Sequence, residues 1–277
     1  MDIHRTLCFP DGLKTCFRCC PPIRPVDYDH LLYRSFVERE LREHTSALKE
    51  RPPGVKPITG YSCWGLGYLD PDYRLVGCLL HPARNNGTDL RHLIDYGSKC
   101  RTATCREAVH FEALAGRRQS FWHGLCLDLD SFEYSSPRSN PLFHVLLWGP
   151  QLLTFIAEKE LPEIARDPLI FERYPFLRLP RPGARRYLVE RIERKFGLET
   201  ISSPRFVERF EDYRKTLARF HADPATVPPD APFTHRLGLD VSFSDFVRLE
   251  LNYRRITQQR ALELRDLIDS DMLKWFS

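Results

Sequence analysis

Cysteine is the residue type whose number and spacing are unusual in this 277-residue chain. Seven of the nine cysteines lie between residues 16 and 105, and none follows Cys126 although more than half of the chain remains. Cys16 and Cys19 have the Cys-x2-Cys spacing that lets two thiolates from one tight turn reach a single metal ion. In a reducing compartment, thiols clustered in this way are more often metal ligands than disulfides.

Counting donors narrows the kinds of site that these residues could form. Thiolate sulfur is a soft ligand for zinc and iron, and four ligands complete a tetrahedral zinc site or hold one iron–sulfur cluster. Eight donors would fill two zinc sites, whereas a single cluster would leave other thiols free, so zinc and an iron–sulfur cluster both remain open as cofactors. The predicted ligands are Cys16, Cys19, Cys20, Cys63, Cys78, His81, Cys100 and Cys105.

The remaining cysteines and histidines are expected to have other roles. Cys126 belongs to the apolar run Phe121-Trp-His-Gly-Leu-Cys-Leu, where a small buried side chain serves packing. Cys8 lies outside the dense part of the cluster and is expected to be a bystander. His123 and His144 sit among aromatic and aliphatic residues, which is typical of a hydrogen-bonded core histidine rather than a ligand.

The order of these motifs resembles the YkgJ-type cysteine-cluster family over residues 13–105. The resemblance rests on Cys16-Phe-Arg-Cys19-Cys20, then Cys63, then Gly77-Cys78-Leu-Leu-His81-Pro82, then further cysteines. It implies a zinc- or iron-chelating region whose activity is undefined. The chain departs from the family pattern where Leu13 replaces the first cysteine, where Phe17 replaces a glycine, and where no Arg-Pro follows Pro82.

The segments that would position the cysteines differ along the chain. Residues 1–26 read as a loop, residues 27–49 as an amphipathic helix, and residues 55–99 as an irregular stretch rich in Gly, Pro, Asn and Asp. A long irregular stretch needs another source of order, and a bound metal is one. Beyond Cys105 the pattern is helical, with apolar faces near 104–117, 120–132, 140–160, 184–196, 204–221 and 242–274.

We therefore predict a mainly α protein in which a loop-rich, metal-binding N-terminal region packs on a helical C-terminal body. The expected division is a cysteine-rich region at residues 1–105 and a helical domain at residues 106–277. The net charge of +4 does not favour nucleic acid as a partner. No apolar run has transmembrane length and the N-terminus lacks a signal-peptide pattern, so we expect no membrane partner and a cytoplasmic location.

Two classes of function are compatible with such a protein. In the first, the metal is structural or sensory and the helical half engages an unknown protein partner. In the second, an iron–sulfur enzyme or electron-transfer protein acts on an unknown substrate. Whether the chain is an enzyme stays open, but no nucleotide-binding loop, nucleophile elbow or metalloprotease motif occurs, and so we favour the first class.

Overall fold

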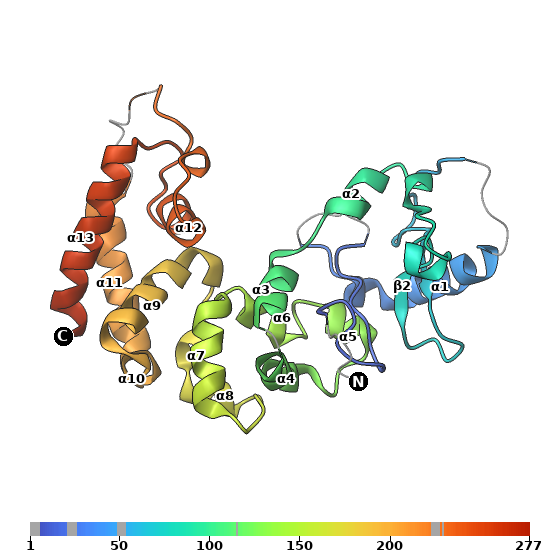
Figure 1. Ribbon diagram of the computed structural model, residues 1–277, viewed down its shortest axis with the longest axis horizontal. Helices are drawn as coiled ribbons and strands as arrows, with labels where there is room; N and C mark the ends of the chain where they lie inside the picture. The colour runs from blue at the N-terminus through green and yellow to red at the C-terminus, as the bar shows by residue number, and fades with distance from the viewer. Residues whose placement is uncertain (1–5, 21–26, 49–53, 115, 223–227, 229) are drawn as a thin grey trace. The chain divides into compact units, whose positions relative to one another are not determined.

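The computed structural model describes residues 6–20, 27–48, 54–114, 116–222, 228 and 230–277. It is mainly helical, as predicted, and the chain divides into a first unit, Met1–Phe143, and a second unit, His144–Ser277. In Figure 1 the chain is coloured from blue at the start of the first unit to red at the end of the second. Among the described helices, none combines the length and the apolar character needed to cross a membrane.

The first unit contains short helices and one antiparallel hairpin. In the hairpin, Leu66 pairs with Cys78 and Tyr68 pairs with Val76. The sequence pattern did not predict these strands, because each has only three residues. The elements are η1 (His30–Tyr33), α1 (Arg34–Ala47), β1 (Leu66–Tyr68), β2 (Val76–Cys78), η2 (Pro82–Arg84), η3 (Arg91–Leu93), α2 (Gly97–Thr102), α3 (Arg106–Leu114), α4 (Arg117–His123), η4 (Gly124–Cys126), α5 (Ser131–Ser135) and α6 (Pro141–Leu146).

The core of the first unit joins α1, the hairpin and the cysteine loop. Val37 and Leu41 on the inner face of α1 are fully buried, and α1 packs on β1. Phe17 is also buried, and its ring meets that of Phe132 edge to face, with 5.1 Å between the ring centroids. Cys63 belongs to the same apolar cluster, and Cys20 and Cys78 pack against it.

Hydrogen bonds from α5 hold the segment that carries the Cys-x2-Cys motif. The Thr15 N–H donates to Ser131 Oγ (3.1 Å), and the Phe17 N–H donates to Ser135 Oγ (3.0 Å). Asp130 caps α5 in a capping box with Glu133. Residues 131–135 bind the N-terminal loop, and the first unit, which includes the predicted cysteine-rich region 1–105, extends to Phe143.

The second unit is built from helices around an aliphatic and aromatic core. The predicted segments 140–160 and 242–274 are each broken: a turn at Gly149 (φ 88°) precedes α7, and Asn252 (φ 62°) lies between the last two helices. Gly197, with φ 82°, ends the helix that covers the expected segment 184–196. The elements are α7 (Pro150–Glu160), α8 (Leu169–Arg173), η5 (Pro175–Arg178), α9 (Pro182–Phe196), α10 (Leu198–Ser202), α11 (Phe206–His221), η6 (Thr234–Arg236), α12 (Val241–Leu249) and α13 (Gln258–Phe276).

A network of ion pairs connects α9, α11 and the end of α12. Glu250 is buried, with its side chain 4% exposed, and its carboxylate lies 3.5 Å from Arg185 Nε and 2.7 Å from Arg214 Nη1. Glu211 accepts from the same two arginines, at 2.6 and 2.9 Å. The network places opposite charges beside one another and so offsets part of the cost of burying them.

We expect Thr15→Val to destabilise the first unit. The Thr15 hydroxyl donates to Val76 O (2.6 Å) and accepts from Val76 N (2.8 Å), and all of these groups are buried. Valine has the same shape but satisfies neither backbone group, so the free energy of unfolding should fall by about 2–4 kcal/mol. Urea denaturation measures the change, and Thr88→Val, at an exposed position, is the matched control.

We expect Glu250→Ala to destabilise the second unit. The substitution leaves the buried Arg185 and the half-buried Arg214 with Glu211 as their remaining acceptor in the network. Breaking a buried ion pair from one side costs about 3 kcal/mol or more. The control is Glu208→Ala at an exposed position of α11, and equal stability of the two variants in thermal or urea denaturation would contradict the role of the network.

Candidate metal centre

Backbone N–H groups point at several of the cysteine sulfurs. Such hydrogen bonds favour the charged thiolate over the neutral thiol and lower its pKa. They arise where the chain turns immediately after a cysteine, as it does before β1, at the end of β2 and at the start of α3. The sulfur and donor residues are Cys63 and Gly65 (3.4 Å), Cys105 and Ala108 (3.3 Å), Cys16 and Arg18, and Cys78 and Leu80.

A first set of thiols gathers where the N-terminal loop meets the start of α3. The Cys16 N–H donates to Cys8 O (2.9 Å), which brings these two residues together. Arg18 Nη1 binds Glu107 at 2.6 Å and so holds the motif beside Cys105. We call Cys8, Cys16, Cys19 and Cys105 the loop thiols.

The loop thiols act on one another electrostatically. Burial raises the pKa of Cys16 well above its usual value, and the charges of Cys8, Cys19 and Cys105 raise it further. Burial likewise raises the pKa of Cys105 to about 12, with added repulsion from Glu107, Cys19 and Cys8. The thiol of Cys8 is desolvated although the residue as a whole is exposed, and its pKa rises to about 11. These groups therefore lie close enough for ionisation of one to oppose that of the others.

A second set of thiols gathers around the hairpin and α2. Cys63 precedes β1, Cys78 ends β2, and the Cys100 carbonyl accepts from Arg91 Nη1 (3.0 Å). Burial raises the pKa of Cys63 to about 12, and the charges of Cys78 and Cys100 add to this. We call Cys20, Cys63, Cys78 and Cys100 the hairpin thiols.

Cys19 and Cys20 connect the two sets by a hydrogen bond between their side chains. This bond from the Cys20 thiol lowers the pKa of Cys19 to about 7, and the positive charge of Arg18 contributes to the lowering. The same bond, followed by burial and by the charges of Cys19, Cys78 and Cys63, raises the pKa of Cys20 well above its usual value. Cys19 is therefore the thiol most readily ionised at neutral pH.

His81, a predicted ligand, and Cys8 and Cys126, which were not predicted to be ligands, have different surroundings. His81 is exposed, and its Nδ1 accepts from the Ala83 N–H (3.2 Å) as the cap of η2. Cys126 is buried and its thiol donates to His123 O (3.1 Å), in keeping with a packing role. Cys8, expected to be a bystander, lies near Cys16, and the backbone hydrogen bond that joins them was not evident from spacing alone.

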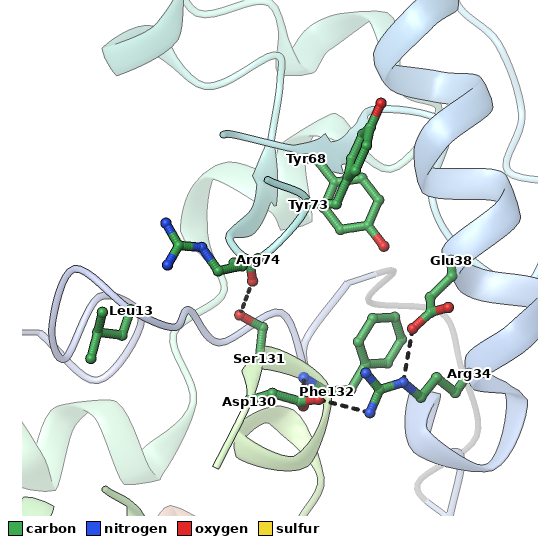
Figure 2. Close-up of a pocket in the computed structure, with 9 residues that line it drawn as sticks. All are labelled: Leu13, Arg34, Glu38, Tyr68, Tyr73, Arg74, Asp130, Ser131 and Phe132. Carbon is green, nitrogen blue, oxygen red and sulfur yellow. Dashed lines mark hydrogen bonds and ion pairs between the residues drawn. The ribbon is translucent and has the colours of Figure 1, made fainter. Parts of the chain in front are cut away.

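A pocket beside the hairpin is a second place where polar groups converge. Figure 2 shows that Arg34, Glu38, Asp130 and Phe132 line it together with Tyr68, Tyr73, Arg74, Ser131 and Leu13. The Arg34 guanidinium binds Glu38 (2.8 Å) and Asp130 (2.7 Å). Because these charges are already paired with each other, the pocket joins α1 to α5 rather than presenting free charge to a ligand.

The sulfurs are numerous, several accept backbone N–H groups, and they repel one another when ionised. In the described part of the chain, however, no three or more His, Cys, Asp or Glu side chains are arranged as a group that could hold a metal ion. Comparisons with protein-family models, curated proteins and solved structures found no match to the chain.

We expect Cys19 to be the first cysteine alkylated when the protein, treated with a chelator, meets iodoacetamide. The hydrogen bond from Cys20 lowers the pKa of Cys19, so Cys19 has the largest thiolate fraction of these cysteines at neutral pH, and only the thiolate reacts. The rate should rise with pH through about 7 and then level off. Peptide mass spectrometry measures the site, with Cys126, buried and of pKa about 12, as the slow internal reference. Faster labelling at Cys126 than at Cys19 would contradict the assignment.

Proposed function

We propose that the first unit binds zinc or an iron–sulfur cluster through cysteine thiolates, that the metal has a structural or sensory role, and that the helical second unit engages a partner protein. The observation that carries the proposal is the gathering of eight cysteines in one unit, with thiols that act on one another across loops of little regular structure. Eight such thiols have no evident use in packing alone.

The electrostatics of the thiols support a cation as the missing counterpart. The pKa of every cysteine except Cys19 is raised, chiefly by burial and, for Cys20, first by its hydrogen bond with Cys19, and repulsion between thiolates adds to this at all of them but Cys126. These thiols are therefore largely protonated at neutral pH. A metal ion would displace these protons and neutralise the repulsion between thiolates. Binding therefore requires the sulfurs to draw closer around the ion, at the cost of ordering the loops that carry them.

A structural role is favoured over a catalytic one by the type of ligand. Sites closed by four thiolates leave no open position on the metal, whereas catalytic sites keep one for water or substrate. Ligation free energy of order 10 kcal/mol for a structural zinc site is large compared with the stability of a small domain. The metal would thus supply order to residues 54–105, whose regular elements are all short.

The direct test is the metal content of protein purified under anaerobic conditions. We expect at least one equivalent of zinc or iron per chain by elemental analysis. Absorption near 400 nm with acid-labile sulfide would identify a cluster, and a colourless protein with zinc would identify the ion. Metal-free protein whose nine thiols all react as fast as in the unfolded chain would refute the proposal.

Metal binding should also weaken on acidification. Because each ligand must lose a proton to bind, and the thiol pKa values are raised in the metal-free state, protons compete with the metal more effectively as pH falls. We expect metal release between about pH 7 and pH 5, followed by faster hydrogen exchange in residues 54–105 while the second unit stays protected. A metal content independent of pH in this range would contradict thiolate ligation.

A further inference from the structure

Two arginines and a histidine surround one exposed phenylalanine in the second unit. Phe233 directly precedes η6 and is 37% exposed. The central guanidinium carbon of Arg255 lies 3.9 Å from the centroid of its ring, and that of Arg236 lies 5.5 Å from the same centroid. The ring of His235 stacks on it, with 5.7 Å between the two centroids. We call Phe233, His235, Arg236 and Arg255 the arginine patch.

Backbone pairing joins the two segments that carry the arginine patch. Phe233 pairs with Arg255 in an antiparallel bridge. Beside this bridge, the Thr234 N–H donates to Arg254 O (3.0 Å), and the buried Thr234 hydroxyl donates to Tyr253 O (2.6 Å). The exposed ring and the guanidinium of Arg255 are therefore held in place before any partner binds, which reduces the entropy lost on binding.

The two guanidinium groups of the patch have no acidic partner within the part of the chain that the structure describes. Arg255 Nη1 donates to Ala231 O (2.6 Å), which uses one of the five N–H donors of a guanidinium. The acidic residue that follows the patch, Asp240, instead caps α12 by accepting from the Phe243 N–H (3.1 Å). Most of the hydrogen-bonding capacity of Arg236 and Arg255 thus remains available to an external acceptor.

Positive charge at the patch is local. Residues 144–277 contain 22 Lys or Arg and 20 Asp or Glu, so the second unit as a whole is nearly neutral. Arginines elsewhere in this unit are matched to carboxylates, as Arg214 is to Glu250 (2.7 Å) and Arg248 is to Asp245 (3.0 Å). A nearly neutral unit with one small basic patch does not provide the extended basic surface that is typical of nucleic-acid binding.

The chemistry of the patch suits carboxylates that flank an apolar side chain. A guanidinium donates two parallel N–H bonds to one carboxylate, and such charge-assisted bonds are stronger than neutral ones. Two like charges beside one ring repel each other, and a carboxylate would offset this repulsion. Arginine and aromatic side chains are also the types that contribute most to the affinity of protein interfaces.

On these grounds, and resting on the partner-binding role proposed above for the second unit, we propose that the arginine patch binds an acidic segment of the partner protein. Glutamate or aspartate side chains of that segment pair with Arg236 and Arg255, and an apolar side chain between them packs on Phe233. Because the charged contacts are exposed, salt should weaken the binding.

Fluorescence anisotropy of a labelled peptide tests the proposal on the full-length protein. The probe is a fluorescein-labelled peptide of Glu-Leu-Glu repeats, and a Gln-Leu-Gln peptide is its uncharged counterpart. We expect the protein to bind the glutamate peptide at least about tenfold more tightly than the glutamine peptide. Arg236→Ala and Arg255→Ala should each weaken binding of the glutamate peptide by about fivefold or more.

A matched control and a second variant guard against indirect effects. Arg265→Ala removes the same charge from a half-exposed position on α13 and should leave peptide binding unchanged. Arg255 is half-buried, so its replacement can disturb the fold. Arg236→Glu changes an exposed side chain and should weaken binding more than Arg236→Ala does, because it repels the acidic peptide. Circular dichroism checks that each variant is folded.

Three outcomes would overturn the proposal. They are equal binding of the glutamate peptide by the parent chain and Arg236→Glu, no binding by the parent chain, and tighter binding of a labelled oligothymidylate of equal charge. The metal content of the same samples tests the metal-binding function separately. A metal-free chain that binds the peptide through the patch refutes only that function, whereas a metal-loaded chain whose peptide binding ignores the patch refutes only this inference.

Discussion

The cysteines of the first unit come from separate segments, and their approach depends on the hydrogen bonds that surround Thr15. Its hydroxyl binds both backbone groups of Val76 in β2, while its N–H binds Ser131 of α5. Ser131 in turn donates to Arg74 O at the entry to β2. A single buried side chain therefore places Cys16 beside the hairpin that carries Cys78, and residues beyond 105 are needed to complete this arrangement.

Once these segments are held together, burial and the charges of neighbouring thiols both oppose ionisation of each cysteine. Burial favours the neutral thiol, and a thiolate formed at one position opposes another at its neighbours. The backbone N–H groups that point at Cys63 and Cys105 act in the opposite direction, because they favour the charged form. Burial and these hydrogen bonds therefore act in opposite directions on the same thiols, and the proposed metal is the charge that would favour their ionised form.

The sequence predicted the helical character, but it predicted the contacts of the cysteines less completely. The expected helix at 184–196 ends at Phe196, because Gly197 adopts positive φ after it. By contrast, the expected segment 204–221 becomes helical only at Phe206, because residues 203–205 form a turn. The proximity of Cys8 to Cys16 depends on a backbone hydrogen bond across eight residues, and the helix-like pattern of 120–132 gave no sign of the break before α5. Such features depend on tertiary contacts that local pattern does not encode.

The second unit has a different physical basis for its stability, and this bears on what a metal in the first unit could do. It contains no cysteine, and its core residues, such as Trp148, Tyr213 and Phe246, are fully buried without help from a ligand. Many of its charged groups pair with one another, as in the network around Glu250. Gain or loss of metal would therefore act on the order of the first unit and leave the second folded. A sensory role would then require that the metal-dependent change in the order of the first unit alter how the folded second unit engages its partner.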